Sequence, residues 1–400
     1  MGENTQYDGY EAFDYLEAGE DYTAFEFQDD LTGEWGEAYE VPLDEADAER
    51  AARLSAENTV VSLHEHAFLF PEDIDEQTEY ARQGRAFTAY EFLSRSNLDA
   101  VFDWHQNGGL KVHSENGWKF SEVVHDVGMR AADIDHQEFV VRARTVDDIR
   151  RAHEEGRLAI VPGIESCMPL ENELDRIEVL YGLGVRMMGI TYAESNALGT
   201  GEADMRPNDG GLSSFGYDAI ERMNRLGMAV SLGHASDRTV LDVAEASDAP
   251  VFLSHNGARA LLDSTRLNTD EGLAAVADTG GVIGVNAAPH ATPSAEHPRH
   301  SIASTMDHFE YLVDLVGVDH VTFGPDTLYG DHYALHGRDV PYEIDPDAEV
   351  ERVEYVEGME NPTEVWHNVV RWLVREGYSD EEIAKVTGEN VLRALEDAWY

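Results

Sequence analysis

Cysteine and long apolar runs are scarce in this chain. Cys167 is the only cysteine, so an internal disulfide is excluded and the composition is typical of a reducing compartment. The first residues lack a basic region followed by an apolar run, and no stretch is apolar over the length of a transmembrane helix. The sequence therefore predicts a soluble cytoplasmic protein without a membrane partner.

Positive charge is also scarce. The chain has 28 Lys and Arg residues and 80 Asp and Glu residues, which gives a formal net charge of −52. Such a chain repels phosphate backbones, so we expect no nucleic-acid partner. The acidic residues are spread over the whole length rather than gathered in a tail, and molar salt would screen their repulsion to about 3 Å. This pattern predicts a protein from a halophile.

The apolar pattern divides the chain into an extension and one large domain. Residues 1–43 are acidic and aromatic without a helical period, so we expect an N-terminal extension that packs on the domain or stays partly loose. Residues 44–400 begin with a predicted helix at 44–58 and continue with eight strand-like runs. These runs are VVSLH, LDAVFDW, LAIVPGIE, VRMMGITY, MAVSLGH, VFLSH, GVIGVN and HVTFGPD.

Helical stretches lie between most of these runs, and this alternation predicts the fold. It favours parallel βαβ units, and eight of them predict an α/β protein, a (β/α)8 TIM-type barrel. The stretch between the second and third runs is too long for a simple connection. We therefore expect an inserted lobe after the second strand, around residues 106–135.

Ionisable side chains stand at the C-terminal ends of several strand-like runs. A single histidine in such a place is more often a hydrogen-bonded core residue than a ligand. In a (β/α)8 barrel, however, this end of the strands carries the active site, so a whole set in this position predicts one convergent site. The set is His64, His66, Glu165, His234, His255 and Asp326.

The first pair follows strand geometry. His64 and His66 are two residues apart, so both can face the barrel axis while Glu65 points outward to the helices or a neighbouring loop. Taken alone, this pair fits a structural role as well as a metal site.

The later residues favour a metal centre. A buried carboxylate at Glu165 needs a cation, and His234 and His255 supply neutral imidazoles suited to zinc or a similar divalent ion. We expect two ions bridged by Glu165, one on each histidine pair, which hold a hydroxide that attacks a carbonyl carbon. Asp326 is then placed to carry the proton to the leaving nitrogen.

Several long segments resemble one family. They are IVPGIESCMPLENELDRIEVLYGLGVRMMGITY, GGLSSFGYDAIERMNRLGMAVSLGHAS, PVFLSHNGARALLDSTRLN, FGPD and REGYSDEEIAKVTGENVLRALE. Together they are similar to the membrane dipeptidase (renal dipeptidase) family of the amidohydrolase superfamily. The resemblance implies a binuclear zinc centre, hydrolysis of short peptides or related amides, and a homodimer. It also implies that Glu165 bridges the ions, that His234 and His255 bind the second one, that Asp326 carries the proton and meets a substrate amine, and that Arg266 contacts the substrate carboxylate.

Three departures from the family pattern bear on the substrate. The family has Asp where this chain has His66, which makes the metal centre one unit more positive. The family's fourth strand ends in Thr-His, whereas Tyr192 follows Thr191 here, and its hydroxyl can still donate to an oxyanion. Residues 285–289, VNAAP, lack a tyrosine that helps hold the carboxylate in some members.

These departures leave three functions open. The first is a metal-dependent hydrolase of a C–N bond, most simply a dipeptidase or a relative that acts on an acylated amino acid. The second is a superfamily hydrolase of a lactone, cyclic amide or ester bearing a carboxylate. The third is a metal-binding protein without turnover, which the presence of Asp326 disfavours because a structural metal site needs no proton carrier.

Nine other histidines lie mostly in polar, loop-like sequence and are expected to be solvated. They are His105, His113, His125, His136, His290, His297, His300, His332 and His336. Trp366 and Trp372 are spaced as in the apolar face of a helix, so we expect both in the core.

Overall fold

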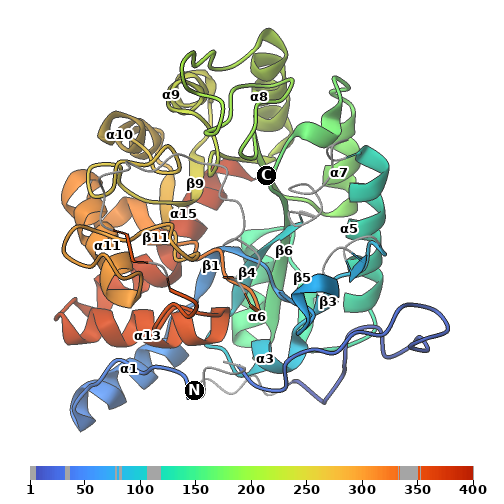
Figure 1. The fold of residues 1–400 in the computed structure, drawn as a ribbon, viewed down its shortest axis with the longest axis vertical. Coiled ribbons are helices and arrows are strands. Elements are labelled where there is room, and N and C mark those ends of the chain that lie inside the picture. Colours follow the sequence, from blue (N-terminus) through green and yellow to red (C-terminus); the bar gives the residue numbers. More distant parts are fainter. Residues whose placement is uncertain are drawn as a thin grey trace.

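Parallel strands form the centre of the molecule (Figure 1). The computed structural model describes residues 6–31, 37–76, 79–80, 83–105, 119–331, 333, 350–351 and 353–399. Eight strands follow one another around the barrel, each hydrogen-bonded to the next in parallel. In order they are β1 (Val61–Glu65), β4 (Ala100–His105), β6 (Leu158–Ile164), β7 (Met187–Gly189), β8 (Ala229–Ser231), β9 (Val251–Asn256), β10 (Val282–Val285) and β11 (Val321–Phe323). The predicted TIM-type barrel is confirmed.

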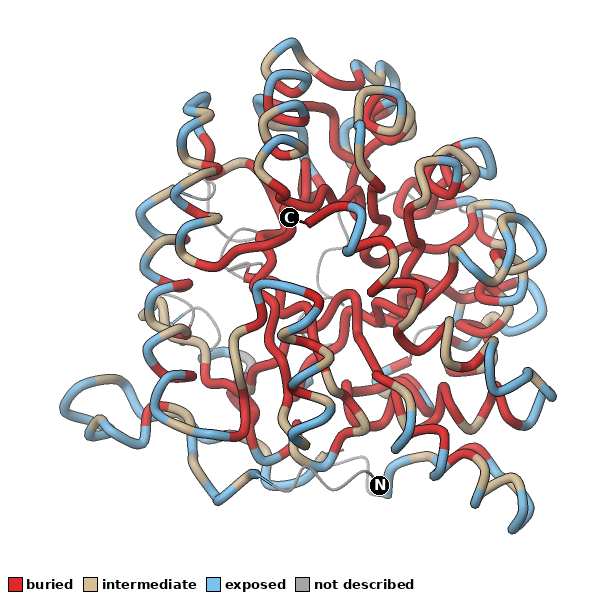
Figure 2. The backbone as a smooth tube through the Cα atoms, turned by 180° about the vertical axis from the view of Figure 1, so that it is seen from behind, coloured by how far each residue is buried: buried red, intermediate tan, exposed pale blue. Residues whose placement is uncertain are grey.

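Helices connect the strands and cover the barrel from outside. They are α1 (Glu45–Glu57), α3 (Tyr90–Ser94), α5 (Phe120–Ile134), α6 (Val146–Glu154), α7 (Arg176–Leu183), α8 (Ser214–Leu226), α9 (Asp237–Ala246), α10 (Asp270–Asp278), α11 (Ile302–Val316), α13 (Pro362–Arg375), α14 (Asp380–Ala384) and α15 (Asn390–Ala398). Ser213, Ser236 and Thr269 cap α8, α9 and α10, because each side chain accepts a hydrogen bond from an amide of the first turn. Buried residues line the inner side of the helices, and exposed residues lie at the periphery (Figure 2).

The barrel closes where the segment after β11 meets the end of β1, a place that we call the seam. Asp326 N–H donates to His64 O at 3.0 Å, and His66 N–H donates to Thr327 O at 2.9 Å. The Glu65 carboxylate accepts from Thr327 N–H at 2.8 Å and from its hydroxyl at 2.7 Å. Glu65 therefore points to a neighbouring loop, one of the two directions that strand alternation predicts.

Aromatic and small residues fill the barrel beneath its C-terminal end. Phe102 and Trp104 of β4 pack with Val161 and Phe252 in one buried cluster. Gly163 leaves room for the Trp104 ring, because a Cβ at Gly163 would lie 3.0 Å from it. The ring stacks on His64 with centroids 4.7 Å apart, so a packed apolar floor supports the first predicted ligand.

The N-terminal extension packs on the side of the barrel. Phe13 is buried against the ribbon formed by β2 (Phe68–Leu69) and β3 (Phe87–Thr88). Its amide donates to Asp133 Oδ1 of α5 at 2.7 Å, and the Tyr10 hydroxyl donates to the same oxygen at 2.8 Å. The domain boundary at residue 43 stays a prediction.

The predicted insertion is partly a helix that belongs to the wall of the barrel. α5 packs on β4 and α7, and the short strand β5 (Val140–Arg142) extends the sheet beside β6. Residues 106–118 lie outside the described residues, so a lobe there stays a prediction.

Candidate metal centre

The six ionisable side chains that end the predicted strands converge at the C-terminal mouth of the barrel. Glu165 lies among three of the imidazoles: its Oε1 is 3.0 Å from His234 Nε2 and 3.5 Å from His255 Nε2. The same oxygen is 3.6 Å from His64 Nε2. All six residues are buried, namely His64, His66, Glu165, His234, His255 and Asp326.

Asp326 lies on the other side of His64. Its Oδ1 is 3.2 Å from His66 Nε2 and 3.4 Å from His64 Nε2. Its Oδ2 is 3.9 Å from His255 Nε2 and accepts a hydrogen bond from Asn286 Nδ2 at 3.4 Å. Asp326 has φ 62°, a left-handed conformation that is uncommon outside glycine and strained at this kind of site. The backbone turn at the seam thus aims this carboxylate at the histidines.

Two overlapping groups of side chains can hold an ion among the described residues. One is His64 with Glu165 and His255, and the other is His64 with His66 and Asp326. His234 borders the first group, because its Nε2 is 3.0 Å from His255 Nε2. This geometry places Asp326 where a metal ligand could lie, in addition to its predicted role as proton carrier. The division of ligands between two ions stays a prediction.

The distances between these donor atoms fit a divalent ion. Ligand atoms about 2.1 Å from a tetrahedral zinc ion lie about 3.4 Å from one another. The contacts of Glu165 and Asp326 with His64 and His66, at 3.2–3.6 Å, are close to that spacing. His64 Nε2 is buried and makes no hydrogen bond, although a neutral buried nitrogen normally has a partner. Both observations match a site that a metal ion completes.

A serine hydroxyl beneath the site orients two of the imidazoles. Ser254 Oγ is 3.2 Å from His64 Nδ1 and 2.9 Å from His255 Nδ1. It is also 2.8 Å from Ser231 Oγ. The Ser231 hydroxyl donates to Ser254 Oγ, so Ser254 can accept a further bond from one of the two Nδ1–H groups. An imidazole that donates through Nδ1 in this way keeps its Nε2 lone pair for a metal ion.

Burial sets the protonation of these groups. It lowers the pKa of His64 to about 4, and burial together with His64 lowers the pKa of His255 well below its usual range. Burial would raise the pKa of Asp326, but the imidazoles of His255, His64 and His66 outweigh it and hold that pKa well below its usual range. Neutral imidazoles beside an ionised carboxylate form a donor set suited to zinc.

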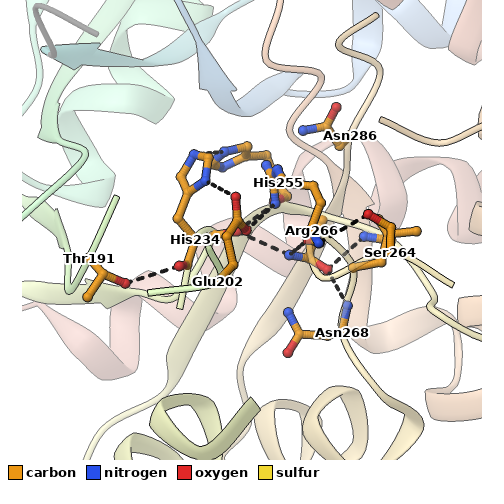
Figure 3. Close-up of polar contacts among 12 residues, drawn as sticks. Thr191, Glu202, His234, His255, Ser264, Arg266, Asn268 and Asn286 are labelled. Carbon is orange, nitrogen blue, oxygen red and sulfur yellow. Dashed lines mark hydrogen bonds and ion pairs between the residues drawn. The ribbon is translucent and has the colours of Figure 1, made fainter. Parts of the chain in front are cut away.

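Glu202 joins the site although the sequence did not single it out (Figure 3). Its Oε1 is 2.9 Å from His234 Nδ1, and its Oε2 is 3.7 Å from Arg266 Nη1. Burial raises the pKa of Glu202 to about 8, with Arg266 opposing. Arg266 is itself buried and donates to Gly233 O at 2.7 Å and to His255 O at 3.3 Å. The predicted substrate contact is therefore tied to the backbone on both sides of the site.

Tyr192 lies beside the second histidine pair. Its ring centroid is 4.3 Å from that of His234, and the residue is buried. The preceding Thr191 hydroxyl donates to His234 O at 3.1 Å. The segment that follows β7 thus places a phenol beside one of the predicted ligands.

Three of the histidines that were expected to be solvated are buried. His105, His290 and His300 are 2%, 7% and 0% exposed, so the prediction for them is wrong. The physical reason is tertiary: His105 ends a strand and contacts Asp126 of α5 at 3.0 Å, and His300 lies 2.8 Å from the amide of His290. His125, His136 and His297 are exposed as predicted, whereas His113, His332 and His336 lie outside the described residues. Trp366 and Trp372 belong to the core, as expected.

Comparisons with known proteins agree on one family. Residues 118–336 match the family described as membrane dipeptidase (Peptidase family M19). Dipeptidase tcpJ of Claviceps purpurea (strain 20.1) is 28% identical over 288 residues, which cover 70% of this chain. The match covers 62% of tcpJ, so this chain spans less than two thirds of that relative's length.

Solved structures share the fold. A crystal structure of an amidohydrolase from Pseudomonas aeruginosa has a TM-score of 0.68 and 25% identity, covering 87% of this chain and 99% of that one. A metallo peptidase from Rhodobacter sphaeroides, liganded with a phosphinate mimic of L-Ala-D-Ala, has a TM-score of 0.65 and 19% identity, covering 86% and 99%. No helix among the described residues has the length and apolar character needed to cross a membrane. Because the family match covers more than half of the 400 residues, this chain belongs to the membrane dipeptidase family, Peptidase family M19.

Proposed function

We propose that this protein hydrolyses a C–N bond, the amide or peptide bond of a small substrate, with two divalent metal ions at the mouth of the barrel. The observation that carries the proposal is the contact of imidazole Nε2 atoms with Glu165 and Asp326 at 3.0–3.6 Å. Membership of a dipeptidase family supports it.

The proposed ligands are five of the converging side chains, namely His64, His66, Glu165, His234 and His255. The bound ions would supply an activated water and an electrophile for the substrate carbonyl. Asp326 accepts the proton that the attacking water loses and returns it to the leaving nitrogen, so that the amide is split into an acid and an amine. Asn286 holds Asp326 Oδ2 and leaves Oδ1 directed at the histidines.

Tyr192 is the proposed donor to the carbonyl oxygen as negative charge develops there. A hydroxyl in this place stabilises the transition state more than the substrate, so its loss lowers kcat rather than raising KM.

Arg266 is the proposed anchor for an anionic group of the substrate. Its guanidinium carries five N–H donors, of which two are directed to the carbonyls of Gly233 and His255. The rest can form a bidentate contact with a carboxylate, although Glu202 lies 3.7 Å away and competes for the same charge. We therefore propose a carboxylate-bearing amide, larger than a simple dipeptide, as the preferred substrate.

A substrate panel tests this function. Metal-loaded protein is assayed in high salt against L,L-dipeptides, N-acyl amino acids and carboxylate-bearing lactones. We expect hydrolysis of the amides, with unmodified dipeptides turned over more slowly than about ten per second. Protein that holds its metal and hydrolyses none of the amides would contradict the proposal, and a preference for lactones would favour the second function left open by His66 and Tyr192.

Four finer features remain proposals. Zinc is the proposed metal because the donor set is rich in imidazole. A halophilic source is supported by the net charge of −52, and a cytoplasmic location by the single buried cysteine. A homodimer is proposed from the family resemblance alone. Metal analysis and light scattering in molar salt test the metal and the dimer.

A further inference from the structure

Glu202 is held rigidly although it lies on the irregular segment between β7 and α8. Glu202 N–H donates to His234 O at 3.1 Å, so its backbone is tied to the residue that its side chain contacts. The preceding Gly201 has no room for a side chain, because a Cβ there would lie 2.2 Å from Ala193 O. Close packing thus places the Glu202 side chain, which is only 1% exposed.

The carboxylate contacts the far side of a proposed metal ligand. His234 Nδ1 is 2.9 Å from Glu202 Oε1 (Figure 3). On the other side of the ring, His234 Nε2 is 3.0 Å from Glu165 Oε1. A neutral imidazole that offers its Nε2 lone pair carries its proton on Nδ1. That proton then has Glu202 as its acceptor, which fixes the tautomer and the plane of the ring.

The second carboxylate oxygen is directed elsewhere. Glu202 Oε2 lies 3.7 Å from Arg266 Nη1, and Arg266 is anchored on the carbonyls of Gly233 and His255. Glu202 belongs to neither group of described side chains that can hold an ion. A buried carboxylate with one oxygen on an imidazole and the other near a fixed guanidinium cannot turn freely.

We propose that Glu202 is a positioning residue, which orients His234 for metal binding and connects this ligand to Arg266. This inference rests on the proposed function, because it assumes that His234 binds an ion. It assigns to the segment between β7 and α8 a direct part in metal affinity.

Two variants of Glu202 and one matched control test the proposal. Glu202→Ala removes the acceptor, whereas Glu202→Gln keeps an amide oxygen for His234 but turns a donor toward Arg266. Asp242→Asn is the control, because buried Asp242 holds the same segment at another point, where it accepts from Leu212 N–H at 3.0 Å. Loss of metal through general loosening of the segment would appear in the control as well.

The measurements are zinc affinity, by competition with a chromogenic chelator, and the visible spectrum of the cobalt-substituted protein. We expect Glu202→Ala to bind one of its ions about 10–100-fold more weakly and to show shifted cobalt bands. Glu202→Gln should recover part of the loss, and Asp242→Asn should match the original protein. Thermal melting of the metal-free proteins shows whether each variant folds. If Glu202→Ala does not fold, the zinc affinity of Glu202→Gln tests the proposal.

The outcomes separate the two proposals. If the original protein binds no metal, the proposed function fails. If it binds two ions and both Glu202 variants keep its zinc affinity within about twofold, or if Asp242→Asn loses as much as Glu202→Ala, the inference about Glu202 is overturned.

Discussion

Gly189→Ala should damage the proposed metal centre without replacing any ionisable side chain. Gly189 ends β7 and pairs with Ser231 of β8, directly beside the backbone of Glu165. A methyl group at this position would lie 2.1 Å from Glu165 O and 2.7 Å from its carbonyl carbon, whereas ordinary van der Waals contact begins at 3.4 Å. The clashing atoms belong to the backbone and cannot rotate away, so β7 must move away from the end of β6, which Glu165 follows.

The structure sets the size of the expected losses in activity and in stability. The strands must part by about 1.3 Å, and Glu165 carries the oxygen shared by three imidazole contacts. A misplacement of about 1 Å can cost about 100-fold in rate. Overpacking costs about 1–3 kcal/mol, which for a chain of this length lowers the Tm by only about 1–4 °C. Activity should therefore fall much further than stability.

The assay compares turnover, metal content and Tm of Gly189→Ala with those of a control, Gly182→Ala. A Cβ at Gly182 of α7 meets nothing within 4 Å, so this alanine should leave activity unchanged and stabilise the helix by about 0.5–1 kcal/mol. If Gly189→Ala keeps full turnover and two ions, the geometry argued for Glu165 is wrong. If it simply fails to fold, the small predicted change in Tm is wrong.

Four other predictions concern a metal ligand, the net charge, the substrate contacts and a buried carboxyl group. His234→Ala should lose one of two ions and nearly all activity, and elemental analysis that finds no metal in active original protein would contradict the metal centre. The Tm should rise with salt from dilute buffer to molar concentrations because the charge of −52 is screened, and a flat or falling Tm would refute this. Tyr192→Phe should lower kcat by about 100-fold with little change in KM, whereas Arg266→Ala should raise KM strongly, and the opposite pattern in steady-state kinetics would exchange their roles. Burial raises the pKa of Glu360 to about 8, so the stability that this carboxyl group contributes is present below its unfolded pKa and is lost as pH rises through about 8. In urea unfolding, the free energy of unfolding of Glu360→Gln should therefore fall less between pH 6 and 9 than that of the original protein, and an equal fall would refute this.

The barrel and its six converging residues could be predicted because they depend on local pattern. An apolar run in the sequence predicts each of the eight strands. Parallel strands bring their C-terminal ends together whatever the connecting loops are. His64 and His66 also follow from alternation alone. Thus Asp326 and Glu165, 161 positions apart in the printed sequence, could be assigned to one site before any contact was known.

Glu202 could not be predicted, because nothing local distinguishes it. It stands in GTGEAD, which has the composition of a turn, and its role depends on the approach of the segment to His234. Buried His105 and His300 were missed for the same reason, since neighbouring elements supply their partners. The short strand β5 was missed because three residues give too little alternation to recognise.

The seam also bears on the order in which the protein is made and folds. The backbone bonds that close the barrel, between His64 and Asp326 and between His66 and Thr327, belong to residues that carry or adjoin the converging side chains. Thr327 meets Glu65 across 262 positions, so this contact forms only after nearly the whole barrel has been synthesised. Contacts so distant in sequence are slow to form. A growing chain therefore cannot assemble the complete donor set early, and the proposed metal centre becomes available only to a protein whose first and last strands have already met.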